Sequence, residues 1–132
     1  MRRNSFNELK RVFDALNGPG GCPWDKKQTH KSLLADLREE VGEYIAAVKS
    51  GNTAHMREEI GDILLHVMFS AQIAKTKNLF TIDDVIDELV RKLKRRHPHV
   101  FGTAKVRSAK EVIANWHKIK RQEKREKARV RA

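Results

Sequence analysis

The residues best suited to chemistry are acidic side chains gathered between positions 36 and 62 of an otherwise basic chain. The formal net charge of the chain is +11, yet this segment holds seven acidic residues against three basic ones. The acidic residues are Asp36, Glu39, Glu40, Glu43, Glu58, Glu59 and Asp62. Glu40 and Glu43 are three positions apart, as are Glu59 and Asp62, so the members of each pair lie on one side of a helix.

Like charges at this spacing call for a compensating positive charge. Each such pair destabilises an isolated helix by about 0.2–0.5 kcal/mol, and partial burial adds to that cost. Glu40 falls at the border of the apolar face that contains Leu33, so we expect it to be partly buried. Two antiparallel helices would bring both pairs together, and carboxylate oxygens are the ligands that Mg²⁺ and Mn²⁺ prefer. The spacing therefore predicts a magnesium or manganese site, and the alternative is a solvated acidic face.

Other metal chemistry has less support in the sequence. A di-iron bundle uses a Glu-x-x-His motif twice, and no Glu of this chain is followed by His at that spacing. His66 lies one turn beyond Asp62 on the same stripe, and we interpret it as a hydrogen-bonding or packing residue. His97 and His99 flank Pro98, which favours a helix-ending turn over a metal site.

Helices must position these acidic residues, because the apolar spacing along the chain is helical and shows no strand pattern. Capping residues and stop signals predict five helices, at residues 5–17, about 29–50, about 53–77, 81–97, and from 108 into a basic tail. We expect the Gly- and Pro-rich segment 18–28 to be a loop in which Trp24 packs against the rest of the protein. The alternative is that Trp24 and Asp25 close the site. The predicted fold class is all-α.

The third predicted helix carries apolar side chains on opposite sides. Ile60, Leu64 and Val67 fall on one face, and Phe69 and Ile73 fall on the other. A helix that is apolar all round is buried on all sides, and four further helices of a small chain would not cover it. We therefore predict a homo-oligomer, either a dimer or a tetramer.

Length and composition limit the class of protein. The 132 residues fit one domain, and 39% hydrophobic with 34% charged residues is typical of a helical globular protein. Cys22 is the only cysteine, so no disulfide can form within the chain and a reducing cytoplasm is favoured. No segment resembles a signal peptide or reaches the roughly 18 apolar residues of a membrane span. We expect a cytoplasmic protein with no membrane partner.

The motifs together resemble the MazG family of nucleoside triphosphate pyrophosphohydrolases. The acidic signature is Glu39-Glu40-x-x-Glu43 followed by Glu59-x-x-Asp62. Further matching segments between residues 18 and 120 are GGCPWD (20–25), Gln28-Thr29, EIGDIL (59–64), AQIA (71–74) and KLKRRHPHVFG (92–102). The resemblance implies an oligomeric all-α protein with a four-helix core of the MazG type and an additional C-terminal helix. It also implies hydrolysis of a nucleoside triphosphate (NTP or dNTP) to the monophosphate and pyrophosphate.

The resemblance also implies roles for individual acidic residues. The magnesium ligands correspond to Glu40, Glu43, Glu59 and Asp62, with Mn²⁺ as a possible substitute for Mg²⁺. The catalytic carboxylates correspond to Glu39, Glu40 and Glu43, with Glu39 orienting the attacking water. A cation held by carboxylates offsets phosphate charge and activates water, so no Ser, Cys or His nucleophile is required.

Basic and aromatic residues near the C-terminus match the family's substrate contacts. Lys92 and Arg96 are one turn apart and are expected to contact the phosphates. Their alternative role is to complement the C-terminal end of their helix dipole. Trp116 is expected to stack on the base, and its alternative is a place in the core.

The basic tail supports a competing interpretation. After Trp116 the chain has eight basic residues against two acidic ones. We divide the chain into a MazG-like domain at residues 1–117 and a basic helical tail at residues 118–132. In the competing interpretation, a weakly active or inactive domain binds nucleotide or nucleic acid through this tail. No motif for reading a base sequence is present, so such binding would be unspecific.

Overall fold

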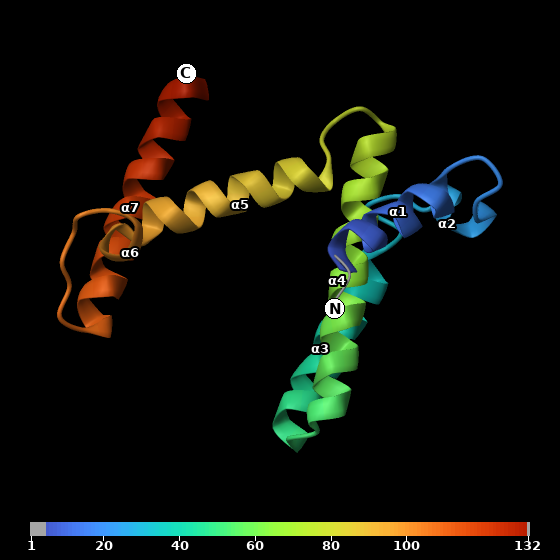
Figure 1. Cartoon of the computed structure of the whole chain (residues 1–132), viewed down its shortest axis with the longest axis horizontal. Coiled ribbons are helices and arrows are strands. Elements are labelled where there is room, and N and C mark those ends of the chain that lie inside the picture. Colours follow the sequence, from blue (N-terminus) through green and yellow to red (C-terminus); the bar gives the residue numbers. More distant parts are fainter. Residues whose placement is uncertain (1–4, 132) are drawn as a thin grey trace. The chain divides into compact units, whose positions relative to one another are not determined.

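A computed structural model describes residues 5–131 as helices joined by loops (Figure 1). The helices are α1 (Ser5–Asn17), α2 (Pro23–Lys27), α3 (Leu34–Ser50), α4 (Thr53–Thr76), α5 (Ile82–Arg96), α6 (Pro98–Phe101) and α7 (Ala109–Arg131). No strand occurs among these described residues, so the all-α prediction is confirmed. Within residues 5–131, no helix has both the length and the apolar character needed to cross a membrane.

Two helix boundaries differ from the sequence expectation. α3 begins at Leu34 and not near residue 29, because the hydroxyls of Thr29 and Ser32 each accept a hydrogen bond from the other's backbone N–H, at 3.0 and 2.9 Å. Such bonds compete with helix formation. The expected loop at 18–28 contains the short helix α2, which starts with Pro23. Trp24 packs as expected, with its ring perpendicular to that of Phe69 and 6.1 Å between centroids.

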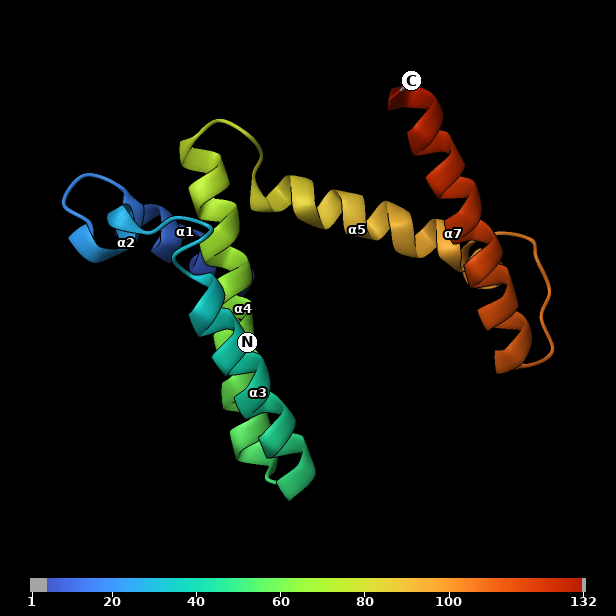
Figure 2. The same ribbon diagram turned by 180° about the vertical axis from the view of Figure 1, so that it is seen from behind.

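The chain divides into two compact units, Met1–Ile82 and Asp83–Ala132. In the first unit, α3 and α4 form a helical hairpin, which Figures 1 and 2 show from opposite sides. Gly51 ends α3 with φ of 71°, a left-handed conformation that glycine adopts without strain. The next residue, Asn52, caps α4 by accepting a hydrogen bond from the backbone N–H of His55 at 3.0 Å. α1 packs on α4, and α2 packs on α1.

The core of the first unit joins α1 to the C-terminal half of α4. Its buried residues are Phe13, Leu33, Met68, Phe69 and Ile73. The rings of Phe13 and Phe69 meet edge to face, with 6.0 Å between centroids. The acidic residues of α4 lie in the opposite half of that helix, where it runs beside α3.

The chain leaves one side of this hairpin uncovered. We call this side the apolar hairpin face, and its side chains are each 40–50% exposed. It consists of Val41, Ile45 and Val48 on α3 and Ile60, Leu64 and Val67 on α4. In the C-terminal half of α4 the chain covers Met68, Ala71 and Ala74 as well as Phe69 and Ile73. Ile60, Leu64 and Val67 face outward within the single chain.

The second unit contains α5, α6 and α7. Both Arg95 and Arg96 at the end of α5 form ion pairs with Glu123 of α7, at 3.1 and 3.0 Å. Pro98 ends α5 as expected and also begins α6. α7 runs without a break through residues 117 and 118, so the basic tail is helical up to Arg131.

Candidate metal centre

Carboxylates from both helices of the hairpin converge. One oxygen from each of Glu40, Glu43 and Glu59 lies within 4.8 Å of the other two. A second group of three, equally close, consists of Glu58, Glu59 and Asp62. Glu59 is common to both groups and therefore joins the acidic pair of α3 to the acidic pair of α4. The sequence spacing predicted this convergence.

The centre of this cluster is shielded from water. Glu59 is only 4% exposed, and Glu40 is partly buried as expected. The Oε2 atoms of Glu40 and Glu59 are both buried without a hydrogen-bond partner in the described part of the chain. A buried polar atom left unpaired costs about 1–3 kcal/mol, and more when it is charged. A divalent cation coordinated by these oxygens would remove that cost, so the residues fit Mg²⁺ or Mn²⁺.

Proximity and burial change how the carboxylates titrate. The pKa of Glu40 is raised from 4.5 to about 7, first by the adjacent carboxylate of Glu59, then by burial and by the charge of Glu43. The pKa of Glu43 is also raised, mainly by the charge of Glu59. Near neutral pH the metal-free cluster therefore retains a proton that a bound cation would displace.

Two residues singled out in the sequence lie beside the cluster. Glu39 is exposed on α3 and belongs to neither group of close carboxylates among residues 5–131. Its charge nevertheless contributes to the raised pKa of Glu43. His66 is buried on α4 and is also outside both groups, as its interpretation as a packing residue requires.

His55 is a contact of the cluster that the sequence analysis did not identify. Its Nε2 lies 3.1 Å from Oε1 of Glu59, one helical turn further along α4. The spacing of four residues was a usable signal, since side chains at i and i+4 meet on a helix. The burial of Glu59 gives this contact its importance, and spacing alone did not reveal that burial.

A pocket of about 260 Å³ adjoins the cluster at Glu40. Its polar lining residues are Asp25, Asp36, Glu40 and His66, and its apolar ones are Phe13, Leu16, Trp24, Leu33, Leu65 and Phe69. A mostly apolar wall with a few polar groups is typical of a site for a small molecule. The sequence favoured packing as the role of Trp24, with closure of the site together with Asp25 as the alternative. The structure places both residues at a pocket beside the carboxylates.

The expected substrate residues Lys92, Arg96 and Trp116 all lie in the second unit. The guanidinium of Arg96 lies over the ring of Trp116, 5.2 Å from its centroid, and Nε of Arg96 donates to Oε1 of Glu123 at 3.0 Å. The ring of His97 also contacts Trp116, with 5.2 Å between centroids. Lys92 is partly buried one turn before Arg96 on α5. The structure thus brings Arg96 and Trp116 together.

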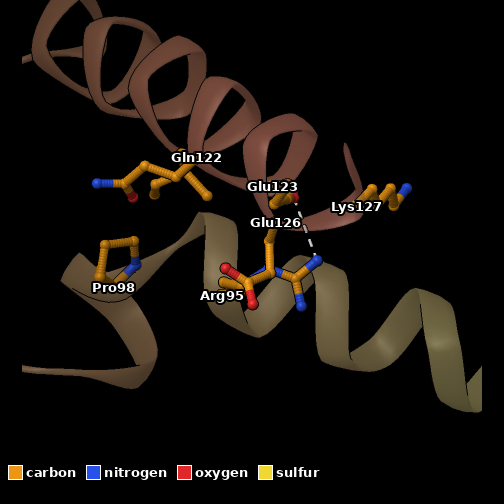
Figure 3. Close-up of a pocket in the computed structure, with 7 residues that line it drawn as sticks. Arg95, Pro98, Gln122, Glu123, Glu126 and Lys127 are labelled. Carbon is orange, nitrogen blue, oxygen red and sulfur yellow. Dashed lines mark hydrogen bonds and ion pairs between the residues drawn. The ribbon is translucent and has the colours of Figure 1, made fainter. Parts of the chain in front are cut away.

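Glu123 of α7 binds both Arg95 and Arg96 of α5. Burial acts to raise the pKa of Glu123, but hydrogen bonds from Arg96 and Arg95 outweigh it, so the pKa is lowered. Figure 3 shows Arg95 and Glu123 meeting at an open pocket of about 620 Å³.

A groove of about 330 Å³ in the same unit is lined mostly by basic side chains. Its lining residues are Arg96, His117, Lys120, Arg121, Glu123, Lys124 and Lys127.

Fold and site together define an all-α protein whose helical hairpin carries buried carboxylates suited to a divalent cation. Comparison with known families agrees with this class. Residues 28–101 match the family model of the MazG nucleotide pyrophosphohydrolase domain, and the matched segment contains all four expected metal ligands. The chain belongs to the MazG family.

Curated relatives match nearly the whole chain. It is 50% identical over 122 residues, or 92% of its length, to "Nucleoside triphosphate pyrophosphohydrolase/pyrophosphatase MazG" of Thermotoga maritima. It is 36% identical over 126 residues, or 95% of its length, to "Nucleoside triphosphate pyrophosphohydrolase" of Escherichia coli K12. It is 48% identical over 121 residues to "Uncharacterized protein YabN" of Bacillus subtilis. The chain spans 46%, 48% and 25% of these three relatives, respectively.

A solved structure has the same fold. The crystal structure of a MazG-related protein from Thermotoga maritima superposes with a TM-score of 0.71 at 29% sequence identity. The match covers 88% of this chain and 98% of that one. The helical architecture expected from the family resemblance is therefore confirmed.

Proposed function

We propose that the chain hydrolyses nucleoside triphosphates, NTP or dNTP, to the monophosphate and pyrophosphate in a magnesium-dependent reaction. The observation that carries this proposal is the pair of buried, unpartnered carboxylate oxygens on Glu40 and Glu59 at the centre of the hairpin. Mn²⁺ would substitute for Mg²⁺, because both accept hard oxygen ligands. Relatives named nucleoside triphosphate pyrophosphohydrolase support the same reaction.

The carboxylates have distinct proposed roles. Glu40, Glu43, Glu59 and Asp62 would hold the metal, which offsets phosphate charge and lowers the pKa of a bound water when present. Glu39 lies one residue before Glu40 and is exposed, so we assign it the orientation of the attacking water. The oxygen of that water forms a bond to the α phosphorus, while the bond from the α phosphorus to the bridging oxygen breaks. Pyrophosphate leaves with the bridging oxygen, and the proton of the water passes to a carboxylate of the cluster.

The nucleoside has two proposed contacts. The pocket beside Glu40 offers the rings of Trp24 and Phe69 to a base, in the same unit as the carboxylates. Trp116 is the other aromatic platform, and it already contacts Arg96 and His97. We favour the pocket for the base because it adjoins the cluster. The proposed contact of Lys92 and Arg96 with the phosphates rests on the family resemblance.

We also propose that the protein is a homo-oligomer, a dimer or a tetramer, in the cytoplasm. The apolar hairpin face leaves six large aliphatic side chains 40–50% exposed on two adjacent helices. Exposed apolar patches of this kind mark protein interaction sites. A second copy presenting the same face would cover it in a symmetric contact. A reducing compartment suits the single free Cys22.

Pyrophosphate release from nucleoside triphosphates with Mg²⁺ tests the proposed reaction. We expect release by the purified chain from at least one nucleotide in a panel of standard and modified triphosphates. Glu40→Ala and Asp62→Ala should abolish release while circular dichroism shows folded protein. Glu8→Gln replaces an exposed acid on α1 and serves as the matched control that keeps activity. Release unaffected by either of the first two changes would refute the site.

The basic groove of the second unit favours one other function, unspecific binding of nucleic acid. Lys120, Lys124 and Lys127 share one side of α7 and line this groove together. Bases that neutralise phosphates give salt-dependent affinity without sequence preference. If this function operates, Lys120→Glu with Lys124→Glu should weaken binding of single-stranded RNA or DNA and flatten its salt dependence, while pyrophosphate release is unchanged. Equal binding by the double variant would exclude it.

A further inference from the structure

We propose that His55 is a positioning residue, which orients the carboxylate of Glu59 for metal binding. This inference rests on the proposed metal site. Nε2 of His55 lies 3.1 Å from Oε1 of Glu59, so one oxygen of the carboxylate is occupied by a protein contact. The other oxygen, Oε2, is buried and has no partner among the described residues. Oε1 of Glu59 therefore contacts His55, and Oε2 remains available to bind the metal.

Glu59 is the ligand for which orientation has the greatest effect. It is the only residue shared by the two groups of close carboxylates found in residues 5–131. A rotation of its side chain would therefore change its distance to Glu40 on α3 and to Asp62 on α4 together. His55 itself belongs to neither group, so its effect on a metal would pass through Glu59.

The environment of the pair separates it from an ordinary surface contact. The side chain of His55 is 41% exposed, but that of Glu59 is only 5% exposed. Fully exposed pairs at this spacing contribute a few tenths of a kcal/mol because water competes for both partners. At Glu59 water is excluded, so loss of His55 would leave both carboxylate oxygens without a fixed partner.

The backbone of His55 is also held in place. Asn52 caps α4 by accepting from the backbone N–H of His55 at 3.0 Å. The first turn of α4 is therefore closed at the residue whose ring contacts Glu59. Hydrogen-bond partners of metal ligands typically contribute 10- to 100-fold to metal affinity.

Calorimetric titration of the full chain with Mn²⁺ tests the proposal without relying on catalysis. His55→Phe keeps a ring but removes the donor, and it should weaken Mn²⁺ binding by about 10- to 100-fold. His55→Gln places a neutral N–H near the position of Nε2 and should restore most of the affinity. His30→Phe is the control, because His30 contacts the hydroxyl of Ser70 at 3.0 Å and belongs to neither carboxylate group.

The possible outcomes separate the two proposals. Wild-type affinity in His55→Phe, or equal weakening in His55→Phe and His55→Gln, would overturn the role of His55. Absence of Mn²⁺ binding in the wild-type chain would instead overturn the metal site and with it this inference. If His55→Phe does not fold, His55→Asn takes its place, because the shorter amide does not reach Glu59, and the same comparison with His55→Gln decides.

Discussion

Glu40 and Glu59 occupy an environment that carboxylates normally avoid. Each has a buried oxygen without a partner among the described residues. The pKa of Glu40 is raised to about 7 by the adjacent carboxylate of Glu59, by burial and by neighbouring charge. Groups that destabilise the metal-free fold are expected where function requires them. The same two residues therefore lower the stability of the metal-free protein and favour the binding of a metal.

Raising the pH should destabilise the metal-free protein through Glu40. Because its pKa rises from 4.5 to about 7 on folding, the folded state keeps a proton that the unfolded state has released. The resulting stabilisation is complete below pH 4.5 and is lost as the pH rises to about 7. We expect the Tm in a chelating buffer to fall across this interval by more in the wild type than in Glu40→Gln, which cannot titrate at this position. Parallel Tm curves for the two proteins would contradict this expectation.

Magnesium should stabilise the fold only when the cluster is intact. A ligand present at 100 times its Kd and bound only by the native state adds about 2.7 kcal/mol of stability. We expect Mg²⁺ to raise the Tm of the wild type accordingly and to leave that of Glu59→Gln unchanged. Thermal unfolding at increasing Mg²⁺ concentration measures both. An equal rise in Tm for the two proteins would place the bound metal elsewhere.

Part of the site was predictable at the residue scale. The spacing of Glu40 with Glu43 and of Glu59 with Asp62 placed each pair on one helical side, and this predicted their meeting across a hairpin. The role of His55 was not predictable, because a His four residues before a Glu is unremarkable until that Glu is known to be buried. The pocket was missed because it depends on Trp24, in a short helix far from the carboxylates in sequence.

At the scale of elements, the connection between α3 and α4 sets the register of the carboxylates. Only Gly51 and Asn52 join the two helices, so little slack exists between Glu43 and Glu59. The left-handed Gly51 and the Asn52 cap together determine where α4 begins. A shift of this turn would move every acid of α4 relative to those of α3.

Removal of the Asn52 cap should therefore affect stability and metal binding together. We expect Asn52→Ala to lower the free energy of unfolding by about 0.5–2 kcal/mol and to weaken Mn²⁺ binding. Asn52→Asp retains a capping oxygen and is the matched control. Chemical denaturation and calorimetry provide the two measurements. Loss of stability without loss of metal affinity would show that the turn does not set the register of the site.

Among the predicted helices, the start of α3 was the boundary that the sequence predicted least well. The apolar period located α1, α4, α5 and α7 to within a residue or two, because helical spacing persists along each. It placed the start of α3 too early, because the hydroxyl contacts between Thr29 and Ser32 override an apolar pattern that continues through them. Spacing also could not decide which apolar residues of α4 the chain would cover, since both sides of that helix are apolar.

At the scale of the whole molecule, the apolar hairpin face makes oligomer formation testable. Leu64 lies on this face and is 40% exposed, so Leu64→Glu would place a charge in the proposed subunit contact. We expect this variant to have the mass of a monomer by light scattering, while the wild type has the mass of a dimer or a tetramer. Val130→Glu adds the same charge at a 79% exposed position of α7 and should leave the mass unchanged. A monomeric wild type at micromolar concentration would contradict the proposal.

The segregation of charge follows the two compact units. The acidic hairpin lies in the first unit and the basic groove in the second. The net charge of +11 therefore does not reveal the cluster of carboxylates in the first unit. Composition alone suggests a nucleic-acid-binding protein, whereas the position of the carboxylates favours an enzyme acting on phosphate anhydrides. The proposed function therefore rests on spacing within the sequence and not on overall charge.

The most direct test is calorimetric titration of the full chain with Mg²⁺ in the presence of a triphosphate analogue that cannot be cleaved between the α and β phosphates. We predict saturable Mg²⁺ binding by the wild type and by Glu8→Gln, and loss of that binding in Glu59→Gln. Absence of Mg²⁺ uptake by the wild type, or undiminished uptake by Glu59→Gln, would contradict the assignment of these carboxylates to a metal centre.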